Sequence, residues 1–239
     1  MAFHTCKVIK TWRDPYDRGW SLTKPKEILI NPGLTVLVGC NGAGKTTLLN
    51  NIEEQLKREK VPCYSYDNLH EGGSNSVGNA LLYENISLVA YLMTASEGEQ
   101  IQENFGTMLE NVHEFLQTGK INTKENRILN AFQSLLDSKE NEDNESELIN
   151  ERWLLLDAID SGLSVDAVVN VIDVLNFILK DAKRMGVKLF IVITANEYEL
   201  CRRNKCFDVN SGQYIEFKDY EDYRKFILKS REKKDKRYE

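Results

Sequence analysis

The sequence has no long hydrophobic run, and its five cysteines are too few and too scattered for a disulfide framework. No apolar stretch approaches the roughly 20 residues that a membrane-spanning helix needs, so we expect no membrane span. The first residues, from Met1 to Cys6, lack the charged-then-apolar order of a secretory signal. We therefore expect a cytoplasmic protein with reduced thiols.

Histidine is also scarce, and the net charge of −6 leaves no general excess of cations. The acidic balance argues against wholesale coating of nucleic acid, although it says nothing about a local basic face. Hydrophobic residues make up 41% of the 239 residues, which is enough for a sizeable core. We expect a single domain over residues 1–239.

A glycine-rich stretch lies between a strand pattern and a helix pattern. Residues 34–38, LTVLV, predict a short buried strand, and apolar residues at helical spacing follow from Leu48 to Leu56. Between them, Gly39 followed by four residues and then Gly44-Lys45-Thr46 fits the phosphate-binding P-loop. Glycines let the main-chain N–H groups point inward, and the N-terminus of the following helix adds positive charge.

The P-loop predicts ATP and Mg²⁺ as ligands. Lys45 is expected to reach the β- and γ-phosphates, and the Thr46 hydroxyl is expected to bind Mg²⁺. The expected nucleotide-binding residues of the loop are Gly39, Asn41, Gly42, Ala43, Gly44, Lys45, Thr46 and Thr47. Asp157, which ends the apolar run of residues 154–157, is expected to be the second metal ligand. We expect its strand to lie next to the P-loop strand.

Three motifs, taken in order, resemble those of the ABC-class ATPases. Residues 41–47, NGAGKTT, resemble that family's P-loop, and residues 154–164, LLLDAIDSGLS, resemble its Walker B strand and D-loop. Residues 94–100, TASEGEQ, are similar to the ABC signature, with Ser96 and Gly98 matching. The resemblance implies that Ser96 and Gly98 cap the ATP of a second chain in an ATP-dependent homodimer. The alternative for Ser96 is an ordinary helix N-cap.

Two positions depart from the family's pattern. Ala158 stands where the family has a catalytic glutamate, and a methyl group cannot accept a proton. Asn196 stands where the family has a switch histidine. General-base and phosphate contacts are each worth ~10²–10⁴ in rate, which predicts an ATPase that binds ATP and hydrolyses it slowly. The opposing interpretation is that Asp160 or Glu197 replaces the base.

The catalytic candidates are therefore Lys45, Asp157 and Asp160. The glutamine that senses Mg²⁺ in the family has no clear match, and the nearest polar residues are Asp67, Asn68 and His70. Tyr16 and Trp20 are candidates for stacking on adenine, although each is more simply explained as a core or surface aromatic.

The order of strand and helix patterns predicts an α/β fold. We expect a P-loop core with a mainly parallel sheet flanked by helices, and an antiparallel β-subdomain at the N-terminus. Residues 101–150 predict a helical insert with an acidic loop. Residues 220–239 predict a basic helix that either contacts nucleic-acid phosphates or is a solvated chain end.

The resemblance is nearest to the RecF-like and chromosome-maintenance branch and to small ATP-binding proteins of bacteria and phages. It implies a role in DNA repair, recombination or defence, by analogy of fold. One alternative is a non-hydrolysing ATP-dependent clamp that binds a protein or nucleic-acid partner. A transporter subunit is disfavoured by the altered catalytic positions, and a P-loop kinase is disfavoured by the signature and D-loop motifs.

Overall fold

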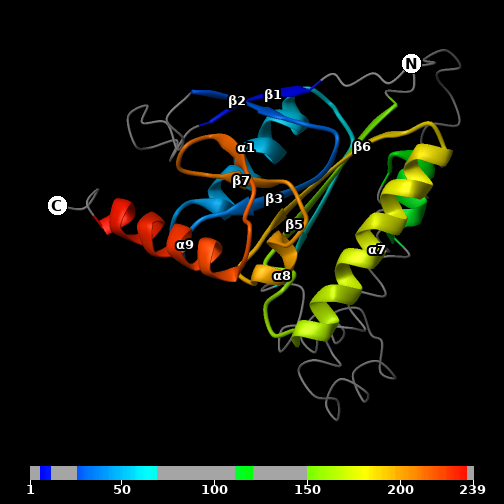
Figure 1. Ribbon diagram of the computed structural model, residues 1–239. Helices are drawn as coiled ribbons and strands as arrows, with labels where there is room; N and C mark the ends of the chain where they lie inside the picture. The colour runs from blue at the N-terminus through cyan, green and yellow to red at the C-terminus, as the bar shows by residue number, and fades with distance from the viewer. Residues whose placement is uncertain (1–5, 12–25, 69–110, 121–149, 236–239) are drawn as a thin grey trace, which may run out of the picture.

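The computed structural model describes residues 6–11, 26–68, 111–120 and 150–235 (Figure 1). The strands are β1 (Lys7–Lys10), β2 (Glu27–Ile30), β3 (Gly33–Val38), β4 (Cys63–Asp67), β5 (Glu151–Asp157), β6 (Lys188–Thr194), β7 (Cys206–Asp208) and β8 (Gln213–Ile215). The helices are α1 (Lys45–Arg58), α7 (Val165–Arg184), α8 (Tyr198–Cys201) and α9 (Tyr220–Asp235). Residues 111–118 are also helical.

Six of these strands form one sheet of order β4-β5-β6-β3-β7-β8, and β1 and β2 form a separate antiparallel pair. Pairing is parallel from β4 to β7, and only β8 runs antiparallel. The predicted α/β class with a mainly parallel sheet and a small antiparallel sheet is confirmed. Apolar runs such as residues 154–156 are typical of parallel strands, which are buried on both faces.

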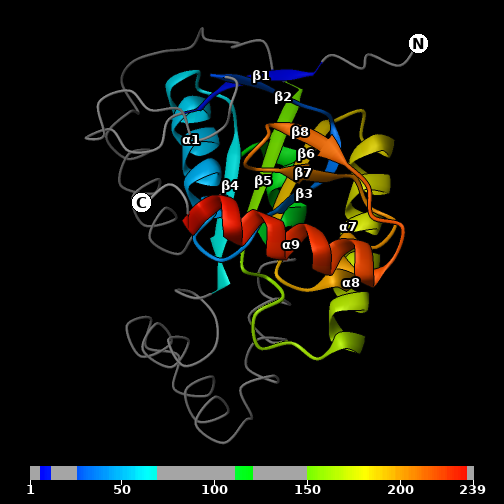
Figure 2. The ribbon, with the colours of Figure 1, turned by 60° about the vertical axis from the view of Figure 1, so that its left-hand side comes forward.

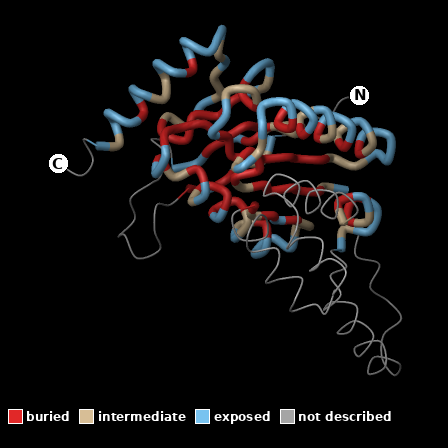
Figure 3. The backbone as a smooth tube through the Cα atoms, turned by 90° about the horizontal axis from the view of Figure 1, so that it is seen from below, coloured by how far each residue is buried: buried red, intermediate tan, exposed pale blue. Residues whose placement is uncertain are grey.

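The sheet separates two apolar cores (Figure 3). Leu154 and Leu156 face the core that contains α7 and residues 111–118, whereas Trp153 and Leu155 face the core that contains α1, β1 and β2. This alternation follows from the two-residue period of a strand. Part of the expected insert, residues 111–118, buries Phe115 completely in the first core. The rest of that insert lies outside the described residues.

The position of β5 corrects one expectation. We expected the strand that ends in Asp157 to neighbour the P-loop strand, but β6 lies between β3 and β5. The expectation was wrong because a sequence motif carries no information on strand order. Parallel strands still bring their carboxyl ends to one edge of the sheet, so Asp157 and the P-loop lie at the same edge.

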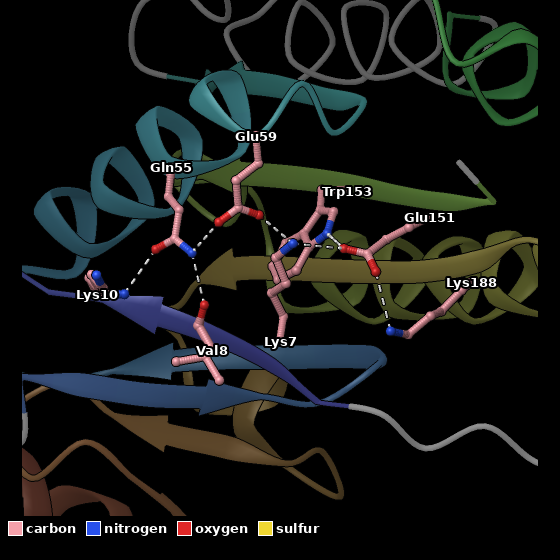
Figure 4. A network of polar contacts seen from close by, with 8 residues as sticks. All are labelled: Lys7, Val8, Lys10, Gln55, Glu59, Glu151, Trp153 and Lys188. Atoms are coloured by element: carbon pink, nitrogen blue, oxygen red, sulfur yellow. Dashed lines mark hydrogen bonds and ion pairs between the residues drawn. The ribbon is translucent and has the colours of Figure 1, made fainter. Parts of the chain in front are cut away.

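A polar network joins the antiparallel pair of β1 and β2 to the C-terminal part of α1, away from the P-loop (Figure 4). The Gln55 side chain accepts a hydrogen bond from the Lys10 N–H and donates one to the Val8 carbonyl, each at 2.9 Å. Lys7 forms ion pairs with Glu59 and Glu151. Glu151 also accepts a hydrogen bond from the Trp153 indole at 2.9 Å, so β1, α1 and β5 are held together.

Gln55→Ala is expected to lower the free energy of unfolding by about 1–2 kcal/mol, because two hydrogen bonds to β1 are lost. Denaturant unfolding measures this change. Glu54→Ala is the matched control, since Glu54 is exposed on the same helix and its ion pair with Arg58 is long, at 3.6 Å. Equal stability of the two variants would show that Gln55 does not hold β1.

Candidate functional site

The P-loop connects β3 to α1 through a tight turn that depends on glycine. Gly42 and Gly44 have φ values of 77° and 103°, which side-chain-bearing residues rarely adopt. The Ala43 N–H donates to the Cys40 carbonyl at 3.0 Å, which closes the turn. Gly44 is the N-cap of α1, so the positive end of this helix points toward the loop.

Lys45 begins α1 and is 9% exposed. Its ammonium group donates a hydrogen bond to the Gly39 carbonyl at 2.9 Å. Burial lowers the pKa of Lys45, and the charges of Asp160, Cys40 and Asp157 oppose that shift. A triphosphate at the loop would favour the charged form of Lys45 further, because opposite charges attract strongly where water is excluded.

Asp157 is oriented by a residue that sequence reasoning missed. The Thr194 hydroxyl, at the end of β6, donates to Asp157 Oδ1 at 2.6 Å and accepts from the Ala158 N–H at 2.8 Å. Thr194 is 1% exposed, so its hydroxyl requires partners. The sequence signal that could have indicated Thr194 is a polar residue at the end of a buried strand, at the same end of the sheet as Asp157.

The turn after Asp157 is braced from β4. Ala158 has a φ of 51°, which is uncommon for a residue other than glycine. The Asn68 side-chain amide donates to the carbonyl groups of Ala158 and Ser161, each at 3.1 Å. Asn68 is one of the polar residues nearest to the expected Mg²⁺-sensing position, and its amide nitrogen is bonded to this turn. Asp67 pairs with Asp157 in the strand register.

Asp160 is 3% exposed and joins the turn after β5 to the loop after β6. Its Oδ2 accepts hydrogen bonds from the N–H groups of Asn196 and Glu197, at 2.6 and 2.7 Å. These two bonds favour a bracing role for Asp160, and its role as a base stays a prediction. Glu197, the other residue that could replace the missing base, is the N-cap of α8.

A cavity of about 450 Å³ lies beside the P-loop, where the predicted residues meet. Its lining consists of Asn41, Gly42, Gly44, Lys45, Thr46, Thr47, Asp157, Ala158, Thr194 and Asn196. Of the other predicted residues, Ala43 is buried in the loop and Gly39 lines an adjoining cavity. Ser96, Gly98, Tyr16, Trp20 and His70 lie outside the described residues.

The cavity fits Mg²⁺ together with a nucleotide. Thr46 and Asp157 both line it, and hydroxyl and carboxylate oxygens are ligands that Mg²⁺ prefers. Within the described part of the chain, no cluster of three or more histidine, cysteine or acidic residues could hold a metal by itself. The ion would therefore be shared with phosphate oxygens, as is usual for Mg²⁺.

The fold and this cavity define an ATP-binding P-loop ATPase domain. A family model described as an AAA domain matches residues 30–200, and the chain belongs to that family. No curated protein matches the chain. A solved structure of cbiO1 from Clostridium perfringens, described as part of the ABC transporter complex cbiONQ, is 15% identical, with a TM-score of 0.42. That match covers 87% of this chain and 86% of the other.

Across residues 6–11, 26–68, 111–120 and 150–235, no helix is both long and apolar enough to span a membrane.

Thr194→Val is expected to weaken Mg²⁺-dependent nucleotide binding, because Asp157 loses the hydroxyl that orients it and the Ala158 N–H loses its acceptor. The unpaired buried groups should also cost about 1–3 kcal/mol of stability. Calorimetry with and without Mg²⁺, together with denaturant unfolding, measures both effects. Thr194→Ser keeps the hydroxyl and is the control. Unchanged Mg²⁺ dependence in the valine variant would contradict the role given to Thr194.

Proposed function

We propose that the chain is a slow ATPase that binds ATP–Mg²⁺ at the P-loop and acts as an ATP-dependent homodimer. The observation that carries the proposal is that Asp157 is the only carboxylate among the described residues lining the cavity. Asp157 is needed for Mg²⁺, so it is not free to take a proton from water. Ala158, which follows it, offers only a methyl group.

The cavity lining includes the groups expected to bind ATP, and no second carboxylate is among its described residues. The main-chain N–H groups of the P-loop and Lys45 would surround the phosphates, and Thr46 and Asp157 would hold Mg²⁺. When bound, Mg²⁺ supplies charge that stabilises the phosphate oxygens. Asn196 lines the cavity at the end of the β6 loop, where its amide can donate a hydrogen bond to the terminal phosphate but cannot act as an acid or a base.

Slow hydrolysis suits a switch better than a pump, because the ATP-bound dimer would persist. We propose a role in DNA repair, recombination or defence, on the basis of the motifs at residues 41–47, 94–100 and 154–164. A nucleic-acid partner is supported by exposed cations of α9, among them Arg224, Lys225, Lys229 and Lys233. A protein partner is the alternative for this face.

Ala158→Glu is expected to raise ATP turnover about 100-fold or more, because it supplies the missing proton acceptor beside Asp157. Phosphate release by the purified protein measures this change, and light scattering in the same samples follows the dimer. The wild type should turn over far below the enzyme median of ~10 s⁻¹ and stay dimeric in ATP, whereas the glutamate variant should lose its dimer as ATP is consumed.

Two controls make that experiment decisive. Ala158→Gln has nearly the same shape as the glutamate but cannot accept the proton, so it should remain slow. Lys45→Ala gives the background rate. Wild-type turnover near the enzyme median that depends on Lys45 would overturn slow hydrolysis. A wild type that stays monomeric in ATP and Mg²⁺ would overturn the dimer.

A further inference from the structure

The C-terminal helix α9 is attached to the P-loop, and Figure 2 shows it crossing in front of the lower part of the sheet. The Cys40 N–H donates to the Ser230 hydroxyl at 3.1 Å, and Lys234 donates to the Asn41 carbonyl at 3.3 Å. The Tyr223 hydroxyl donates to the Asn196 carbonyl at 2.8 Å. Ser230 and Tyr223 are buried, so this stretch of α9 is not a solvated chain end.

One face of α9 makes all these contacts. Residues 223, 227, 230, 231 and 234 follow the spacing at which side chains share one side of a helix. The basic residues at 225, 229 and 233 lie outside this series and are exposed. Arg231 is exposed as well, but it and Lys234 line the cavity beside the P-loop, whereas Lys225, Lys229 and Lys233 do not.

A second cavity of about 470 Å³ lies between this face and the P-loop. It shares Asn41 and Asn196 with the phosphate cavity, so the two cavities adjoin there. Asn196, whose amide is proposed to contact the terminal phosphate, belongs to both linings, so the terminal phosphate of a bound ATP would face this shared wall. On this placement, the second cavity would lie on the far side of the γ-phosphate from Lys45 and Thr46, which line only the first cavity.

The described charged residues that line this second cavity are all cations. Arg231 and Lys234 line it, and no acidic residue does. Asp235 is the acidic residue in contact with both, at 4.0 Å from Arg231 and 3.8 Å from Lys234, and its side chain is 59% exposed. Contacts of this length at an exposed carboxylate are weak, so an incoming phosphate can replace them at little cost.

We propose that Arg231 and Lys234 form an anion subsite that binds the γ-phosphate of the ATP held by the same chain. The inference rests on the proposed function and adds to it a means of recognising the third phosphate. Cations at this position attract the charge on the terminal phosphoryl group. Asn196, which stands in place of the switch histidine, is neutral. Arg231 and Lys234 therefore supply positive charge at the terminal phosphate from within the same chain.

The subsite distinguishes ATP from ADP, and this difference gives the test. Calorimetry with Mg²⁺ compares a non-hydrolysable ATP analogue with ADP on the full chain. The double variant Arg231→Met, Lys234→Met should bind the analogue about tenfold or more weakly and bind ADP unchanged. Lys234→Arg, which keeps the charge, should restore most of the loss relative to Lys234→Met.

Two matched variants separate this role from others. Lys233→Met removes a neighbouring cation outside the cavity and should change neither affinity, which controls for net charge. Ser230→Ala weakens the attachment of α9 to the P-loop, and because α9 carries both cations it should weaken binding of the analogue more than binding of ADP. Equal weakening of both nucleotides by the double variant, or no weakening of either, would overturn the subsite. A wild type that binds neither nucleotide would instead overturn the proposed function.

Discussion

The burial of the Lys45 ammonium group is the constraint on which the site depends. A charged amine that is 9% exposed is costly unless opposite charges or hydrogen-bond acceptors lie near it. Here the Gly39 carbonyl accepts its hydrogen bond, while Asp160 and Asp157 supply the nearby negative charge. The two acidic residues are therefore part of the environment that partly offsets the cost of burying Lys45 at the start of α1.

Each of these acidic residues is fixed by bonds that cross between strands. Thr194 at the end of β6 orients Asp157 at the end of β5, and Asp160 accepts from the N–H groups at 196 and 197 after β6. Asn68, after β4, holds the carbonyl groups of the turn that begins at Ala158. The ends of β4, β5 and β6 are thus joined by side-chain hydrogen bonds around the turn after Asp157.

Local sequence was sufficient for the parts of the site that lie within one stretch of chain. The P-loop, the helix after it and the strand ending in Asp157 are each specified by short-range patterns, and the structure has all three. Strand order was not predictable, because a motif does not state which strand lies beside it. The contact between Cys40 and Ser230 joins residues 190 positions apart, and no local pattern indicates it.

The hydroxyl of Thr194 and the backbone of Ala158 were missed for a related reason. Both depend on partners contributed by neighbouring strands, and a φ of 51° at an alanine is imposed by the surrounding turn rather than by the residue. The basic helix was recognised from its composition, but its attachment to the P-loop follows only from the tertiary fold. Sequence therefore identifies the phosphate-binding groups better than the groups that position them.

Titration of ATP into the purified chain by calorimetry, with Mg²⁺ present, tests the central claim most directly. The account predicts saturable heat with one ATP bound per chain, and no such heat for Lys45→Ala at matched folding. Absence of binding by the wild-type chain, or equal binding by the alanine variant, would contradict the claim that the P-loop and Lys45 hold a triphosphate.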